Sequence, residues 1–328
     1  MNQAIFVPLC ALFFLLLEGA LRAEPRVFVG TNGQTLRGEL VSVVGDNVSI
    51  KREDGPTVTF KAADFCPRDR EYFHEFSSKA GSVAPLSGPD ARGLTNTLGM
   101  KFVPVPGTSV LFCIHVTRNR DYKKYAEARG QVDDSWKNAN YKDLKVSEGE
   151  DDPAVMVSWE DAKAFCGWLS AAEHRTYRLP TDHEWSMAVG IGANEDASAS
   201  PQSKSGRVRE VYPWGSQWPP PPGTENFADL SLQEKIPSYK GIIPGYRDGY
   251  ATTAPVMAFP PNKLGLYDMG GNVAQWCEDR FGPTDERRVL RGGSWKNELP
   301  RQLLSSTRNA EKAGGRFIYD GFRVVAVP

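Results

Sequence analysis

Histidine and cysteine are scarce in this sequence, which limits the metal and redox chemistry that it can support. The 328 residues contain only four histidines and five cysteines. No C-x-x-C motif is present, so neither a zinc ribbon nor a dithiol redox site is indicated. The histidines form no H-x-H or H-x-x-x-H pair, and we expect solvent-facing imidazoles rather than an iron site. They are His74, His115, His174 and His183.

A clear excess of charge is also missing. The 39 lysines and arginines nearly balance the 40 aspartates and glutamates, which leaves a net charge of −1. This balance argues against nucleic acid or an anionic membrane surface as a partner. The hydrophobic fraction of 40% is ordinary for a globular protein.

An apolar run long enough to cross a bilayer comfortably is absent from the N-terminus. Residues 5–17 are apolar, but the run is short and small residues follow it. We therefore predict a signal peptide over residues 1–23, with Ala20 as the alternative cleavage position and an uncleaved anchor as the other interpretation. The mature chain would then have no membrane span and would be secreted, periplasmic or in the cell envelope.

Export would also place the remaining cysteines in a compartment that can oxidise them. Loss of the leader removes Cys10, and the sequence does not determine how the other four pair. A Cys166–Cys277 disulfide is one alternative. The four are Cys66, Cys113, Cys166 and Cys277.

The first folded unit is predicted over residues 24–78. Short alternating segments separated by Asn-Gly and Asp-Gly turns are typical of an antiparallel sheet. Apolar residues two positions apart mark strand faces: Val41 and Val43, Val48 and Ile50, Val58 and Phe60. The pattern predicts a small barrel of about five strands that resembles SH3-like modules. A short helix over 67–76 and a Gly/Ser/Pro-rich linker over 79–94 follow.

The second unit is predicted over residues 95–328. The spacing of apolar residues predicts a helix over 122–129. Ser158 is a natural N-cap for a helix that buries Ala162, Phe165, Cys166 and Leu169 on one face. The pair Thr181 and Glu184 forms the capping box of a further helix. The polar segment 190–209 is expected to be an exposed loop.

Residues 264–295 carry the most specific pattern of the chain. They read LGLYDMGGNVAQWCEDRFGPTDERRVLRGGSW. Other motifs lie in order along the unit: V-S-W-E-D-A at 157–162, R-L-P-T at 178–181, Y-P-W-G at 212–215, T-x-P-V at 253–256 and G-F-R at 321–323. Together these motifs resemble the formylglycine-generating enzyme, or sulfatase-modifying factor, superfamily. The resemblance implies an α+β fold related to C-type lectins, with much irregular structure.

The resemblance also implies a reactive centre that this chain does not have. The family binds copper(I) through two thiols placed three and eight residues after the serine of R-G-G-S, and it oxidises a substrate cysteine. Those positions are Asn297 and Gln302 here, and the chain has no cysteine after Cys277. We therefore predict neither copper nor iron as a cofactor, and we expect the family's oxidase activity to be lost.

Calcium is the cofactor that the resemblance does imply, since the family binds it through hard oxygen ligands. The residues that correspond to the first family site are Asn226, Phe227, Asp248 and Tyr250. The residues that correspond to the second site are Asp268, Gly271, Val273 and Gln275. In the second site the family's Asn has become Asp268 and its Glu has become Gln275. Turn capping by hydrogen bonds is the alternative role for both sets.

The family's peptide groove gives the last set of candidate residues. The corresponding residues are Arg291, Ser294, Trp295, Arg308 and Asn309. Arg291 and Arg323 have an alternative role as structural ion-pair residues.

Three functions remain open from the sequence. The first is a non-catalytic module that binds a peptide, a glycan or a protein. The second is a formylglycine-generating-type or other metal-dependent oxidoreductase acting on a protein. The third is a structural component of a cell-surface assembly.

Overall fold

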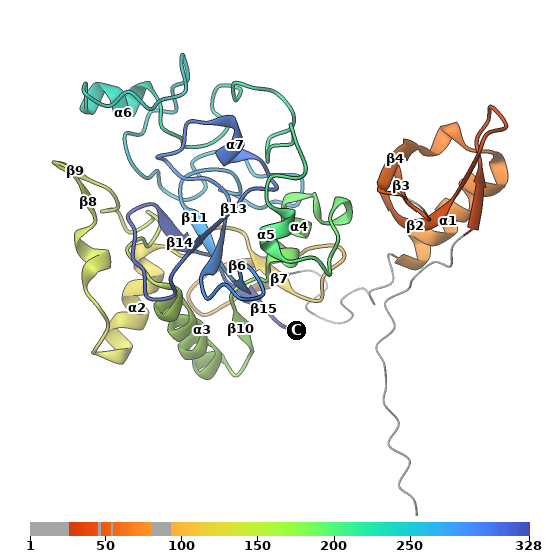
Figure 1. The fold of residues 1–328 in the computed structure, drawn as a ribbon. Helices are drawn as coiled ribbons and strands as arrows, with labels where there is room; N and C mark the ends of the chain where they lie inside the picture. The colour runs from red at the N-terminus through yellow and green to blue at the C-terminus, as the bar shows by residue number, and fades with distance from the viewer. Residues whose placement is uncertain (1–25, 45–46, 54, 81–92) are drawn as a thin grey trace, which may run out of the picture. The chain divides into compact units, whose positions relative to one another are not determined.

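The computed structural model describes residues 26–44, 47–53, 55–80 and 93–328 (Figure 1). Packing divides the chain into two compact units, with the boundary between Ala80 and Gly81. The predicted signal peptide and most of the predicted linker lie outside the described residues. Within the described ranges, no helix combines the length and the apolar character that a membrane crossing needs.

The first unit is a four-stranded antiparallel meander, in the order β1-β2-β3-β4, followed by one helix. Its strands are β1 (Arg26–Val29), β2 (Thr35–Val44), β3 (Asn47–Arg52) and β4 (Thr57–Lys61). The expected fifth strand does not form in the described residues. A single antiparallel bridge from Gly30 to Phe65 stands in its place, just after the 3₁₀ turn η1 (Ala62–Asp64).

A β-bulge changes which face of β2 is buried. The pairing register of β2 with β3 shifts between Leu40 and Ser42, so Val41 is the extra residue. Leu40 is buried and Val43 packs against the core, whereas Val41 is 42% exposed. The prediction that Val41 and Val43 share a face was wrong because a bulge reverses the alternation.

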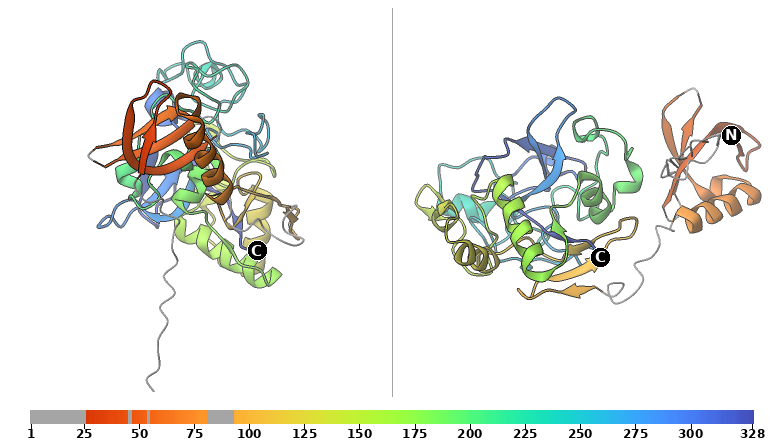
Figure 2. Two further views of the ribbon diagram at one scale, coloured as in Figure 1. Left: turned by 90° about the vertical axis from the view of Figure 1, so that its right-hand side faces the viewer. Right: turned by 90° about the horizontal axis from the view of Figure 1, so that it is seen from below.

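The helix of this unit is longer than predicted. Helix α1 (Pro67–Ala80) takes in the first two residues of the predicted linker and lies beside the sheet (Figure 2). Phe73 on α1 packs with Phe28 and Phe65 in the core. Asp69 accepts from the backbone N–H of Val29 and pairs with Arg26 at 2.8 Å, which holds the helix against β1.

The second unit contains two sheets and a short hairpin. One sheet has the order β10-β15-β7-β6-β5 and the other has the order β13-β12-β11-β14, in which only β11 and β14 are parallel. The strands are β5 (Leu94–Thr95), β6 (Lys101–Pro104), β7 (Leu111–Cys113), β8 (Asn140–Tyr141), β9 (Leu144–Lys145), β10 (Tyr177–Arg178), β11 (Ala274–Arg280), β12 (Arg288–Arg291), β13 (Arg308–Glu311), β14 (Asp320–Phe322) and β15 (Val325–Ala326).

The helices of this unit are short apart from two that lie side by side, α2 and α3 (Figure 1). They are α2 (Asn119–Arg129), η3 (Ser135–Asn138), α3 (Trp159–Glu173), α4 (Asp182–Val189), η4 (Gly192–Asn194), α5 (Pro201–Lys204), α6 (Leu230–Lys235) and α7 (Pro300–Leu303). The predicted N-cap Ser158 and the predicted capping box of Thr181 and Glu184 are both present, since Ser158 accepts from Asp161 N–H and Thr181 accepts from Glu184 N–H. The predicted face of α3 is buried as expected.

The segment between α5 and β11 consists mainly of loops, and the structure describes every residue of this segment. The six-residue helix α6 is the one regular element over residues 205–273. Loop residues in this region, including Asn226, Phe227 and Asp268, are nevertheless almost fully buried. Buried loop backbone needs polar partners, so this part of the chain must be held by side-chain hydrogen bonds or by a ligand.

Candidate functional site

The two positions where the family places thiols hold amides that stabilise turns. Asn297 Oδ1 accepts from the backbone N–H of Ser294 at 2.9 Å and from its hydroxyl at 3.0 Å. Gln302 Oε1 accepts from the N–H groups of Glu298 at 3.1 Å and Leu299 at 2.9 Å, which caps α7. Sulfur is a weak hydrogen-bond acceptor, so cysteines could not hold these turns equally well.

The other thiols of the described chain are poor candidates for redox chemistry at this place. All four described cysteines are free, so the Cys166–Cys277 bridge is not formed. Burial raises the pKa of both Cys113 and Cys166 to about 12, and it also raises the pKa of Cys277 well above its usual value. The thiolate is the form that binds copper and reacts, and burial in apolar surroundings suppresses it.

The histidines do not all face solvent as predicted. The side chain of His115 is buried, and its Nδ1 lies 2.8 Å from the carbonyl oxygen of Val116. Burial lowers the pKa of His115 to about 4, so the ring is neutral near pH 7. His174 is exposed at the end of α3, as expected.

The predicted groove residues are mostly part of the interior. Arg291 is fully buried, and its Nη1 lies 2.6 Å from Asp182 Oδ1. Arg308 pairs with the same carboxylate at 2.9 Å and with Glu195 at 2.5 Å, and Lys204 completes the cluster at 2.8 Å from Asp182. We call Asp182, Glu195, Lys204, Arg291 and Arg308 the ionic cluster.

The ionic cluster holds buried side chains and backbone segments together. Burial alone would raise the pKa of Asp182, but the charges and hydrogen bonds of Arg291, Arg308 and Lys204 hold it well below its usual range. The arginines are also tied to the backbone, since Arg291 donates to the carbonyls of Asp182 and Ser305. Their guanidinium groups are therefore not available to a peptide, and the alternative ion-pair role of Arg291 is the one that the geometry supports.

The remaining groove residues do not form a common surface either. Trp295 is fully buried and donates from Nε1 to the carbonyl of Ile318 at 3.1 Å. Ser294 is 3% exposed and holds Asn297, while Asn309 on β13 is exposed. Four of the five residues are therefore buried in the packed interior, and Asn309 is the exposed one.

The structure brings the predicted first calcium residues together. Asp248 accepts from the N–H of Phe227 at 2.9 Å and from the N–H of Tyr250 at 2.8 Å, so its carboxylate lies against both backbone segments of the set. Asn226 is fully buried, and its Oδ1 has no hydrogen-bond partner among the described residues. Burial raises the pKa of Asp248 to about 7. A buried acceptor without a donor and a desolvated carboxylate suit a hard cation.

The predicted second set is assembled differently. Gln275 Oε1 accepts from Arg323 Nε at 3.0 Å and from Trp185 Nε1 at 3.3 Å, and Gln275 Nε2 donates to the carbonyl of Asp268 at 2.6 Å. The oxygen of Gln275 is thus already engaged, and it is not free to replace the family's carboxylate. Asp268 has a positive φ of 55° and is buried, which is costly for a residue other than glycine.

The family of the chain follows from comparison with known proteins. A family model described as the sulfatase-modifying factor enzyme 1-like domain matches residues 110–327. The chain belongs to this family. The matched range takes in most of the second unit, including the whole sheet β13-β12-β11-β14 and every candidate site residue.

The relatives include one named as inactive and others named formylglycine-generating enzyme. Inactive C-alpha-formylglycine-generating enzyme 2 of Bos taurus is 39% identical over 145 residues, which are 44% of this chain and 38% of that protein. The formylglycine-generating enzyme of Thermomonospora curvata is 28% identical over 216 residues, covering 59% of this chain and 61% of that one. The chain thus spans about two fifths of the length of the first relative.

Solved structures of similar fold are more distant. PvdO from Pseudomonas aeruginosa is 23% identical and aligns over 67% of this chain and 80% of its own, with a TM-score of 0.47. CarF is 21% identical, covers 70% of this chain and 88% of its own, and has a TM-score of 0.46. The mixed helix and sheet content of the second unit is α+β, as the family resemblance implies.

Sequence reasoning missed several buried charged residues of the family domain, among them Glu195, Lys204 and Glu225. Glu195 and Lys204 were assigned to an exposed loop, but their side chains are 3% and 7% exposed in the ionic cluster. Glu225 was not singled out, although it directly precedes the predicted ligand Asn226 and is 6% exposed. A carboxylate next to a proposed cation ligand was the signal that could have identified it.

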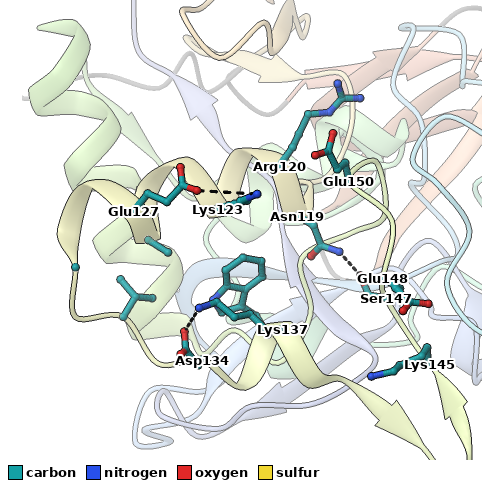
Figure 3. Close-up of a pocket in the computed structure, with 14 residues that line it drawn as sticks. Asn119, Arg120, Lys123, Glu127, Asp134, Lys137, Lys145, Ser147, Glu148 and Glu150 are labelled. Atoms are coloured by element: carbon teal, nitrogen blue, oxygen red, sulfur yellow. Dashed lines mark hydrogen bonds and ion pairs between the residues drawn. The ribbon is translucent and has the colours of Figure 1, made fainter.

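A surface cavity of about 520 Å³ lies between α2 and residues 130–150 (Figure 3). Its lining is charged but balanced, with Arg120, Lys123, Lys137 and Lys145 opposite in sign to Glu127, Asp134, Glu148 and Glu150. Trp136 and Asn119 contribute buried side chains, and Asn119 donates to Ser147 Oγ at 2.8 Å. None of the family's thiol or groove positions lines this cavity.

Proposed function

We propose that the protein is an exported, non-catalytic member of the sulfatase-modifying factor family that binds a peptide, glycan or protein ligand outside the cytoplasm. Calcium stabilises its loop-rich half. The observation that carries this proposal is the role of Asn297 and Gln302. Each uses its side-chain oxygen to hold two backbone or hydroxyl donors where the family needs a copper-binding thiol.

The name of one relative supports the same interpretation. That relative is called an inactive formylglycine-generating enzyme, and it is 39% identical to this chain over the aligned part. A relative that its name describes as inactive therefore exists beside this chain. The second candidate, a metal-dependent oxidoreductase, has no comparable support in the positions of the thiols.

The cavity beside α2 is the surface that we propose for the ligand. Its four basic and four acidic lining residues give no strong net potential, which favours a neutral or zwitterionic ligand over a polyanion. Two of the pairs already interact across short distances, Lys137 with Asp134 at 2.6 Å and Lys123 with Glu127 at 4.0 Å (Figure 3). Polar rim groups and a partly apolar floor are usual in such pockets.

Calcium would be held by Asn226 and Asp248 with the carbonyls of Phe227 and Tyr250. As a hard cation it supplies positive charge to desolvated oxygens and links loops that have little regular structure. The residues themselves do the rest: the N–H groups of Phe227 and Tyr250 orient the Asp248 carboxylate, and Asp229 accepts from the N–H of Asp248 while capping α6.

A copper(I) competition tests the non-catalytic part of the proposal. The purified protein and a copper(I) chelator compete for one equivalent of the metal, and the Asn297→Cys/Gln302→Cys double variant is the positive control. We expect the wild type to leave the metal on the chelator, because the described thiols of its second unit, Cys113, Cys166 and Cys277, are buried. Tight one-to-one retention of copper(I) by the wild type would contradict the proposal.

A further inference from the structure

The carboxylate of Glu225 lies at the second predicted calcium site, although no family position accounts for it. Glu225 is 6% exposed, and its Oε1 accepts from the N–H of Gly270 at 3.1 Å. Its other oxygen, Oε2, is buried and has no hydrogen-bond partner among the described residues. The carboxylate of Asp268, a residue of the same predicted site, is a close electrostatic neighbour of Glu225.

The backbone at Gly271 lies very close to the segment that contains Glu225 and Asn226. A Cβ on Gly271 would lie 2.6 Å from the carbonyl oxygen of Asn226 and 3.0 Å from the Cβ of Glu225. Only glycine allows this contact, so the 268–271 loop and the 225–226 segment are pressed together. Gly271 is also one of the residues whose carbonyl corresponds to a family ligand.

The positive charge nearby does not neutralise this pair of carboxylates by contact. Arg323 is fully buried and interacts electrostatically with Glu225 and Asp268. Its guanidinium nitrogens, however, donate to neutral oxygens, namely Gln275 Oε1 and the carbonyls of Cys113 and Tyr267. The carboxylates of Glu225 and Asp268 are therefore both buried, and the nearby guanidinium of Arg323 donates a hydrogen bond to neither. Burial of two negative charges in this way costs free energy unless a further cation binds.

We infer that Glu225 replaces the carboxylate lost at Gln275 and that it rebuilds the second cation site together with Asp268 and the carbonyl of Gly271. The site takes a hard divalent cation of the calcium class. This inference rests on the proposed calcium binding of the family domain. It differs from the family arrangement because the site has two carboxylates instead of one, and they come from two different loops.

The unsatisfied atoms at these loops are hydrogen-bond acceptors, and oxygen acceptors are also the ligands that a hard cation prefers. Glu225 Oε2 and Asn226 Oδ1 are both acceptors, and both are inaccessible. Fewer than three His, Cys, Asp or Glu side chains converge at any point of that structure, so carbonyl and amide oxygens must complete the ligand set.

Calcium stoichiometry of the full chain tests the inference. Protein stripped with chelator is dialysed against calcium, and bound metal is counted by elemental analysis alongside the melting temperature. We expect two calcium ions per wild-type chain and one in Glu225→Gln. The matched control Glu286→Gln removes an exposed carboxylate and should keep two. The reciprocal variant Glu225→Gln/Gln275→Glu returns the carboxylate to the family position and should restore the second ion.

A first-site variant separates this inference from the proposal on which it rests. Asp248→Asn should lose the other ion and keep the one at Glu225. If the wild type binds a single ion and Asp248→Asn abolishes its binding, the first site is supported and the proposed role of Glu225 is overturned. Two ions retained in Glu225→Gln would also overturn it, and no calcium in the wild type would overturn both.

A calcium-bound crystal structure of the wild type decides the matter if Glu225→Gln does not fold. The inference requires an ion at about 2.3–2.6 Å from Glu225 Oε2. An Oε2 that instead contacts a hydrogen-bond partner, with no ion beside it, would overturn the inference.

Discussion

Substitution of Asp182 by asparagine tests whether the arginines of the former groove are structural. Asp182 is 1% exposed and lies within 2.6–2.9 Å of nitrogens of Arg291, Arg308 and Lys204. Asparagine keeps the shape and one acceptor oxygen but removes the negative charge. Three buried cations would then face the single carboxylate of Glu195 within the cluster.

The expected loss is large because unpaired buried charges are costly. Removing one partner of a buried ion pair destabilises a protein by about 3–5 kcal/mol. For a unit the size of residues 81–328, a change of 1 kcal/mol shifts the melting temperature by about 2–4 °C. Asp182→Asn should therefore lower the melting temperature by about 6–20 °C.

Tryptophan fluorescence isolates the relevant transition. All eight tryptophans lie between residues 136 and 295, so their signal reports only on the second unit. The matched control is Asp285→Asn, which breaks an exposed pair with Arg287 and should leave the transition unchanged. A shift of less than 2 °C in Asp182→Asn would refute the structural interpretation and return Arg291 and Arg308 to consideration as ligand-binding residues.

Three further predictions concern the turns, the buried histidine and the metal. Asn297→Ala and Gln302→Ala each leave two donors unpaired and should destabilise the second unit by about 1–3 kcal/mol in urea unfolding, whereas no loss would mean that these amides do not hold the turns. The pKa of His115 is about 4 in the folded protein and 6.5 in the unfolded chain. The contribution of His115 to the free energy of unfolding is therefore complete above pH 6.5 and is lost as the pH drops toward 4. The His115→Gln variant should reduce this loss by on the order of 3 kcal/mol, whereas the control His174→Gln, at an exposed position, should not. Chelation of calcium should lower the melting temperature by the equivalent of about 2.7 kcal/mol relative to calcium at 100 times its Kd, and an unchanged temperature would count against both calcium sites.

Locally encoded features could be predicted from the sequence. Ser158 and Thr181 were identified as helix caps because a capping box depends on residues three positions apart. The family was predicted from ordered motifs and is confirmed by the family model over residues 110–327. The α+β character of the second unit followed from the same motifs.

Features that depend on distant contacts could not be predicted in the same way. Val41 is exposed because of a β-bulge, and the residue types around it do not predict that bulge. The polar segment 190–209 looked like surface, but the side chain of Glu195 is buried because it pairs with Arg308, 113 residues further along the chain. Lys204 is buried because it pairs with Asp182, which Arg308 also contacts. The groove residues were transferred from the family by position, and position alone does not determine which side chains reach the surface.

Oxygen uptake by the copper-treated wild-type protein with a cysteine-containing peptide tests the central claim most directly. The account predicts a rate equal to that of copper and peptide without protein, and no conversion of the peptide cysteine to an aldehyde. Protein-dependent oxygen uptake with formation of that aldehyde would contradict it, because Asn297 and Gln302 would then belong to a working oxidase rather than to the turns that they hold.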